Sequence, residues 1–197
     1  MLNEKLKHHR LILASGSPRR QDFFKNLGLD FEIQLKPVKE EFPPRLTHFE
    51  ISDYLAQLKA LPFKDNLQPK DILITSDTIV WHNNTALGKP RDSQEAYSIL
   101  KSLSNATHEV ITSVCFTTTT YTKTLYNITK VTFKELSDDE INYYIKNYQP
   151  FDKAGAYGIQ EWIGQIGVTK IEGSYFNVMG LPVHLVYKTL NAIAETT

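Results

Sequence analysis

Cysteine, net charge and long apolar runs are what this sequence has little of. Cys115 is the one cysteine in 197 residues, so no internal disulfide can form, which fits a reducing compartment. The 22 basic residues equal the 22 acidic residues, whereas a general nucleic-acid grip needs a basic surplus. No apolar run approaches the ~20 residues that cross a bilayer, and residues 1–10 lack the apolar core of a secretory signal. We therefore expect a cytoplasmic protein with neither a nucleic-acid nor a membrane partner.

Several catalytic motifs are also missing. The sequence has no Gly-x-x-x-x-Gly-Lys-[Ser/Thr] P-loop and no Gly-x-Ser-x-Gly elbow, which argues against a P-loop NTPase and a serine hydrolase. The six histidines have no metal-ligand spacing, and with one cysteine a zinc site is not expected. Cys115 stands in an apolar, Thr-rich run, so we interpret it as a core residue rather than a nucleophile.

The order of the predicted elements indicates an α/β fold. Strands are expected at 11–14, 29–35, 71–81, 109–121, 124–135 and 165–172, and helices at 17–27, 48–60, 92–103, 137–149 and from Pro182, with a glycine-containing loop at 151–164. The two long β-rich stretches predict a hairpin, so the sheet should be mixed rather than purely parallel. We expect a twisted sheet with flanking helices and two lobes around a cleft. Residues 1–10 should form a flexible leader, and residues 11–197 a single domain.

The segment Leu11–Arg20 suggests an anion site. A buried strand leads into a small-residue turn and then into a helix that begins at Pro18, with Ser17 as its N-cap. Arg19 and Arg20 stand in the first helical turn, where the helix dipole disfavours cations by about 0.3–1 kcal/mol. Two arginines beside free N–H groups are expected if phosphate binds between them. Pairing with a carboxylate elsewhere is the alternative.

A single carboxylate interrupts the strongest predicted strand. Asp77 lies within the apolar run Ile72–Val80, where a carboxylate is costly unless it is paired, hydrogen-bonded or bound to a metal. Such a group can hold a divalent cation, activate water, or do both. Lys59, on the inner side of the 48–60 helix, and Lys89, in a Gly-Lys-Pro turn, are further cations that suit a polyphosphate.

Two other segments supply candidate ligands. Glu40 and Glu41 offer hard oxygen ligands for Mg²⁺, although a solvated acidic loop is the simpler interpretation of either residue alone. The small residues of 152–160 suit a backbone pressed against a flat ligand. Gln160 at the end of this run carries both a donor and an acceptor, which suits the edge of a pyrimidine.

Taken in order, these blocks resemble the Maf family of nucleoside triphosphate pyrophosphatases. The resemblance extends from Leu11 to about Leu190. It rests on Leu-Ala-Ser-Gly-Ser-Pro-Arg-Arg (13–20), Leu-Ala-Gln-Leu-Lys-Ala (55–60), Ser-Asp-Thr-Ile-Val (76–80), Gly-Lys-Pro (88–90) and the runs at 152–160 and 173–183. It implies a fold akin to the inosine triphosphate pyrophosphatases, and a hydrolase of nucleotide metabolism.

The resemblance also implies roles for individual residues. Asp77 would be the catalytic base or a metal-bound carboxylate, and the triphosphate would be held by Ser15, Arg19, Arg20, Lys59 and Lys89. Mg²⁺ or Mn²⁺ would be bound by Asp77 and one glutamate of the 40–41 pair, of which we favour Glu41. The subgroup that cleaves dTTP and UTP is matched at Arg19, Thr78 and Gln160.

Two positions depart from the family pattern. Lys39 stands where an aspartate is common, and Glu161-Trp162 follows Gln160 where glycine is usual. Both departures touch the expected base pocket, so the reaction is more firmly implied than the base.

The expected activity is hydrolysis of dTTP and UTP, with modified pyrimidine nucleotides as further house-cleaning substrates, to the monophosphate and pyrophosphate. A non-catalytic nucleotide-sensing regulator of cell division and a purine (ITP/XTP) pyrophosphatase are the alternatives. A homodimer is expected from base rates and resemblance.

Overall fold

The protein was studied as a computed structural model, which describes residues 1–195. The chain divides into two compact units. The first contains Met1–Asp77, Thr112–Asn127 and the segment from Gly180 onward, and the second contains Thr78–Ile111 and Ile128–Met179. Residues 196 and 197, the end of the expected domain, lie outside the described residues.

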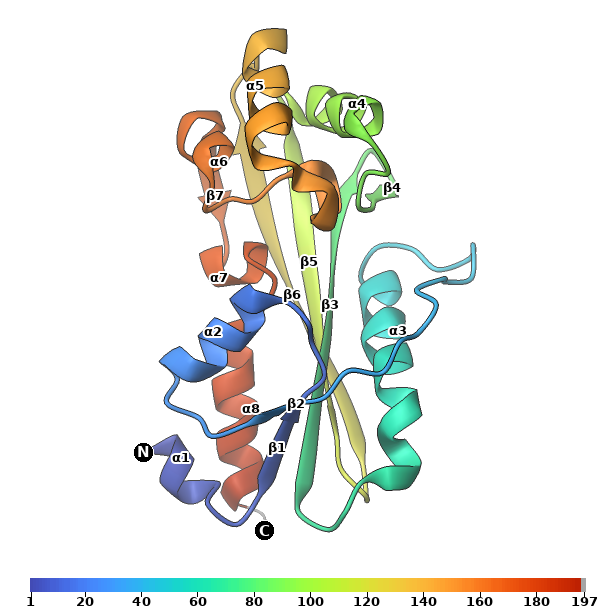
Figure 1. Cartoon of the computed structure of the whole chain (residues 1–197), viewed down its shortest axis with the longest axis vertical. Helices are drawn as coiled ribbons and strands as arrows, with labels where there is room; N and C mark the ends of the chain where they lie inside the picture. The colour runs from blue at the N-terminus through green and yellow to red at the C-terminus, as the bar shows by residue number, and fades with distance from the viewer. Residues whose placement is uncertain (196–197) are drawn as a thin grey trace. The chain divides into compact units, whose positions relative to one another are not determined.

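A mixed sheet runs through the chain, as the long hairpin predicted (Figure 1). Its strands follow the order β2-β1-β3-β5-β6-β7, with β4 paired to β3. Strand β1 is parallel to β2 and β3, whereas β4 is antiparallel to β3 and β7 is antiparallel to β6. The strands are β1 Arg10–Leu13, β2 Glu32–Ile33, β3 Asp71–His82, β4 Thr85–Leu87, β5 Thr107–Thr117, β6 Thr122–Phe133 and β7 Val168–Glu172.

Helices separate most of these strands along the chain. They are α1 Leu2–Lys5, α2 Pro18–Asn26, α3 Phe49–Ala60, α4 Ser93–Leu103, α5 Asp138–Tyr148, α6 Trp162–Gly167, α7 Tyr175–Val178 and α8 Val183–Glu195. Short 3₁₀ turns occupy Leu61–Asn66, Pro150–Asp152 and Ala154–Ala156. No helix among residues 1–195 is long and apolar enough to cross a membrane.

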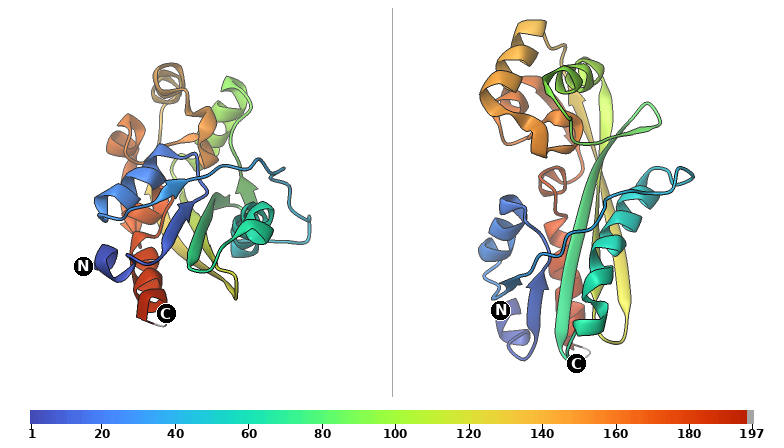
Figure 2. Two further views of the ribbon diagram at one scale, coloured as in Figure 1. Left: turned by 60° about the horizontal axis from the view of Figure 1, so that its bottom comes forward. Right: turned by 45° about the vertical axis from the view of Figure 1, so that its right-hand side comes forward.

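The first unit has helices on both sides of its strands. Helix α3 lies on one side of β1 and β3, and α2 and α8 lie on the other, as Figure 2 shows from two more directions. Ala56 of α3 packs with Ile12, Leu73 and Cys115, one from each of three strands. Cys115 is fully buried, which confirms its prediction as a core residue.

Residues 1–10 do not form the flexible leader that we expected. Helix α1 buries Leu2 and Leu6, which are 3% and 2% exposed. Lys5 Nζ lies 2.9 Å from Glu195 Oε1 of α8. Two leucines in an otherwise polar segment are too few to give a helical pattern in the sequence, yet they suffice once α8 provides an apolar face.

The second unit packs α4, α5 and α6 around one apolar cluster. Leu100, Tyr144 and Ile163 of these helices are fully buried, together with Phe133 of β6. The predicted N-terminus of α5 is confirmed, because Ser137 and Glu140 form a complete capping box there.

The spacing of Asp92 and Glu95 favours a capping box at the start of α4, but only half of it is formed. Asp92 accepts from the Glu95 backbone N–H at 2.9 Å, as expected of an N-cap. The Glu95 carboxylate, however, accepts from the backbone and the side chain of Arg91, at 2.7 and 2.9 Å. Arginine offers this carboxylate a charged partner in addition to an amide.

Three further elements differ from the sequence prediction. Strand β2 shortens to Glu32–Ile33, two exposed residues at the edge of the sheet, and β4 was not predicted. Helix α6 begins within the predicted 151–164 loop and extends to Gly167, so it replaces the start of the strand predicted at 165–172. Its Gly164 and Gly167 lower the helix propensity, which concealed the helix. A Cβ atom at Gly164 would lie 1.9 Å from the Ile159 carbonyl oxygen, so the close packing of this segment requires a glycine.

Gly155 provides a test of the packing in the second unit. Its φ is +69°, and a Cβ atom there would lie 2.6 Å from Val80 Cγ2, a buried side chain of β3. Gly28 has nearly the same φ, +66°, and an added Cβ there would have nothing within 4 Å. Alanine at this position therefore measures the cost of the left-handed backbone alone, without a steric clash. We expect Gly28→Ala to lower the free energy of unfolding by about 1–2 kcal/mol, and Gly155→Ala by about 1–3 kcal/mol more because of overpacking. Urea unfolding midpoints measure both, and equal losses would contradict the packing.

Candidate active site

Asp77 is a buried carboxylate on β3. It is the last residue of the first segment of the first unit, Met1–Asp77, and is 6% exposed. The strand residues before it, Asp71–Ser76, are all buried, which fixes the backbone on which Asp77 stands. The sequence prediction that this carboxylate needs a partner is met by a lysine of α3.

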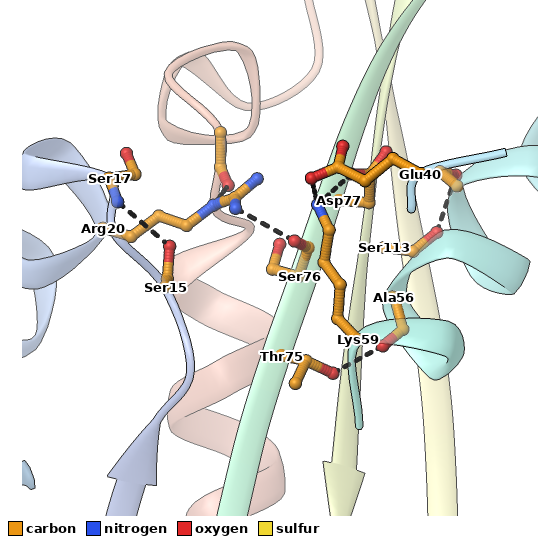
Figure 3. A network of polar contacts seen from close by, with 12 residues as sticks. Ser15, Ser17, Arg20, Glu40, Ala56, Lys59, Thr75, Ser76, Asp77 and Ser113 are labelled. Atoms are coloured by element: carbon orange, nitrogen blue, oxygen red, sulfur yellow. Dashed lines mark hydrogen bonds and ion pairs between the residues drawn. The ribbon is translucent and has the colours of Figure 1, made fainter. Parts of the chain in front are cut away.

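Lys59 reaches Asp77 from the last turn of α3. Its Nζ lies 2.5 Å from Asp77 Oδ1 (Figure 3). Helix α3 is fixed to the strands at two further points. Thr75 Oγ1 donates to the Ala56 carbonyl at 2.6 Å, and the Ser52 and Ser113 hydroxyls lie 2.7 Å apart. The lysine is therefore held by its helix as well as by the carboxylate.

Glu40, rather than Glu41, joins this pair. Lys59 Nζ lies 3.2 Å from Glu40 Oε1, while Glu41 forms an exposed ion pair with Lys39 at 2.7 Å. The Glu41 backbone N–H donates to the Lys39 carbonyl at 2.9 Å, so Glu40 is the middle residue of a three-residue turn whose two ends are the ion-paired Lys39 and Glu41. The choice of Glu41 as the metal ligand has no support in this arrangement.

The charge on Asp77 is set by opposing effects. Burial raises the pKa of the Asp77 carboxyl above its ordinary value, and the charges of Lys59 and Arg20 oppose that rise, whereas Glu40 adds to it. A carboxylate in this setting binds a proton more readily than an exposed one.

Arg20 donates hydrogen bonds to two backbone carbonyls. Its Nε donates to the Gly180 carbonyl at 2.7 Å, and its Nη1 donates to the Ser76 carbonyl at 2.9 Å (Figure 3). These two hydrogen bonds orient the guanidinium. Burial lowers the pKa of Arg20, and Asp77 is among the charges that oppose this shift.

The turn before α2 is closed differently from our prediction. Ser17 is the N-cap, but its side chain makes no capping hydrogen bond. Instead, Ser15 Oγ accepts from the Ser17 backbone N–H at 3.3 Å, and the Ser15 carbonyl accepts from Gln21 Nε2 at 3.1 Å. Arg19 follows in the first turn of α2, half-buried.

The other predicted site residues belong to the second unit. Thr78 follows Asp77 directly in β3, Lys89 is exposed between β4 and α4, and Gln160 lies half-buried in the turn before α6. Their roles remain predictions.

Two carboxylates, those of Asp77 and Glu40, lie close enough together to be considered as ligands of a metal ion. Within the described part of the chain, no three His, Cys, Asp or Glu side chains gather as a metal site. Asp77 and Glu40 nevertheless meet at one ammonium group. Mg²⁺ is commonly held by one or two carboxylates together with substrate phosphates, so this donor set fits such an ion.

Comparison with known proteins gives consistent matches. A family model described as "Maf-like protein" matches residues 10–193. The dTTP/UTP pyrophosphatase of Flavobacterium johnsoniae is 62% identical over 193 residues, covering 98% of this chain and all of the relative. Proteins of the same name from Christiangramia forsetii and Phocaeicola vulgatus are 57% and 48% identical, and the alignments cover 100% and 96% of this chain and 100% and 99% of the relatives.

A solved structure supports the fold alone. The Ham1 protein of Staphylococcus aureus is 16% identical, with a TM-score of 0.51, over 93% of this chain and 99% of that one. The family match spans almost the whole chain and includes Asp77, Lys59 and Arg20. This chain therefore belongs to the Maf family.

Proposed function

We propose that this chain hydrolyses dTTP and UTP to the nucleoside monophosphate and pyrophosphate. Relatives of that name are 43–62% identical and align with nearly the whole chain. The observation that carries the proposal is the buried Asp77 carboxylate, which Lys59 joins to Glu40. The positive charge of Arg20 also acts on Asp77 and opposes the rise in its pKa that burial causes.

The cations of the site suit a triphosphate. The Arg20 guanidinium donates to the Ser76 and Gly180 carbonyls, which fixes its direction. Together with Ser15, Arg19, Lys59 and Lys89, it would bind the phosphate chain and stabilise the charge that develops on the pyrophosphate leaving group.

Asp77 is the group proposed to take the proton of the attacking water. The water oxygen bonds to the α-phosphorus, the bond from that phosphorus to the bridging oxygen breaks, and pyrophosphate leaves with the electron pair. A carboxyl whose pKa burial raises is a better proton acceptor than an exposed aspartate, which suits a general base. Lys59 counters the charge of the ionised form before substrate binds.

Asp77 and Glu40 are the residues proposed to hold Mg²⁺ or Mn²⁺. Such an ion would neutralise phosphate oxygens and lower the pKa of a bound water. A cation already occupies the point where the two carboxylates meet, namely the Lys59 ammonium group. The expected homodimer remains a prediction.

A panel of nucleotides tests the activity. Pyrophosphate release from dTTP, UTP, CTP, ITP and XTP is measured with Mg²⁺ or Mn²⁺, and dTTP and UTP should have the highest kcat/KM. Higher values for ITP and XTP would replace the proposal with the purine pyrophosphatase. No release from any nucleotide would favour the sensor.

Asp77→Asn tests the chemical step. The amide keeps the shape of the side chain but cannot accept the proton, so turnover on dTTP and UTP should fall at least about a hundredfold. Circular dichroism and a melting curve provide the control that the variant is folded. A rate near that of the unchanged protein would refute the assignment of Asp77.

Glu40→Gln and Glu41→Gln form a matched pair for the metal. Glu40→Gln should raise the Mn²⁺ concentration for half-maximal activity about tenfold or more, because it removes one of two carboxylate ligands. Glu41→Gln should leave that concentration within about twofold, because its partner is the exposed Lys39. The reverse order would restore Glu41 as the ligand.

A further inference from the structure

Gln160 stands in a tight turn. The Glu161 backbone N–H donates to the Gly158 carbonyl at 3.0 Å, which makes Gln160 the third residue of a four-residue turn. The residues before the turn are buried, and Gln160 itself is half-buried. The direction of the Gln160 amide therefore depends on how this turn is held.

The carboxylate of Glu161 folds back beneath the turn. It accepts a short hydrogen bond from the Tyr144 hydroxyl of α5, and Lys153 Nζ lies 3.2 Å from its Oε1. Lys153 is 8% exposed and also pairs with Asp152 at 2.7 Å. A buried ammonium group needs such partners to offset the cost of removing its charge from water.

The Tyr144 hydroxyl joins both ends of the turn. It donates to Glu161 and accepts from the Gly158 backbone N–H at 3.0 Å. Burial raises the pKa of Tyr144, and Glu161 raises it further, so the hydroxyl keeps the proton that it donates. A Cβ atom at residue 158 would lie 2.8 Å from Glu161 Cδ, so glycine makes the room in which the carboxylate lies.

We propose that Tyr144 and Glu161 are positioning residues that fix the Gln160 amide and so set the preference for a pyrimidine base. The inference rests on the proposed function, in which Gln160 reads the base. An amide discriminates between bases only if its donor and acceptor point in fixed directions, and small displacements weaken such selection strongly.

The segment before the turn is anchored separately. Tyr157 and His108 share a hydrogen bond of 2.7 Å, and the Gly155 N–H donates to the Gly88 carbonyl at 3.1 Å. Removing the Tyr144 hydroxyl should therefore loosen the turn while the unit stays folded.

Tyr144→Phe and Glu161→Gln test the clamp through selectivity. The ratio of kcat/KM for UTP to that for ITP should fall about tenfold in each variant, mainly through a higher KM for UTP. Tyr148→Phe is the matched control and should leave the ratio unchanged. Tyr148 lies on the same helix, and its ring stacks on that of Tyr144 with 5.0 Å between the centroids, but its side chain is 37% exposed. An unchanged ratio in Tyr144→Phe overturns the proposal.

A double-mutant cycle with Gln160→Ala separates positioning from a general structural effect. If Tyr144 acts through Gln160, then Tyr144→Phe should lower the selectivity no further in the Gln160→Ala background. An equal loss in both backgrounds overturns the proposal.

Amide hydrogen exchange distinguishes failure of the clamp from failure of the proposed function. The Glu161 amide should exchange at least about tenfold faster in Tyr144→Phe, and unchanged exchange overturns the clamp. Absence of pyrimidine preference in the unchanged protein instead overturns the proposed function, and with it the link from the clamp to selectivity, whatever the exchange rates.

Discussion

Burying the Asp77 carboxylate costs free energy that only nearby positive charge and hydrogen bonds can offset. Lys59 is the nearest such charge, at 2.5 Å, so the position of α3 on the strands becomes a condition for the carboxylate. The Thr75 bond to the Ala56 carbonyl fixes that position a turn before Lys59. The packing of Ala56 against Leu73 and Cys115 therefore supports the charge pair as well. If α3 shifted on the strands, the buried Asp77 carboxylate would lose its nearest positive charge.

The local signals in the sequence were sufficient where a residue's role is set by its own neighbours. The capping box that begins α5 and the charge at Asp77 within an apolar strand are of this kind, and so is the inward-facing Lys59. Such features are visible because the partner lies within one helical turn, or because an isolated charge requires a partner whatever the fold.

Features that depend on distant packing were not predictable in the same way. Helix α1 depends on contacts with α8, which lies at the other end of the chain. The loop that carries Glu40 has no regular pattern of apolar residues from which the direction of each side chain could be predicted. Glu40 is set apart from Lys39 and Glu41 by a three-residue turn, which the charged sequence of this loop did not reveal. Helix α6 was concealed by glycines that the close approach to Ile159 requires, so packing overrode propensity there.

Each unit has one lysine that lies between two carboxylates, but the arrangement has a different consequence in each unit. In each, a lysine is shared by two carboxylates: Lys59 by Asp77 and Glu40, and Lys153 by Glu161 and Asp152. One carboxylate of each pair is the more buried, and the outer one contributes little stability because water screens it. In the first unit the outer carboxylate, Glu40, can therefore turn toward a ligand at small cost. In the second the inner one, Glu161, carries the turn, so that lysine serves to hold the backbone still.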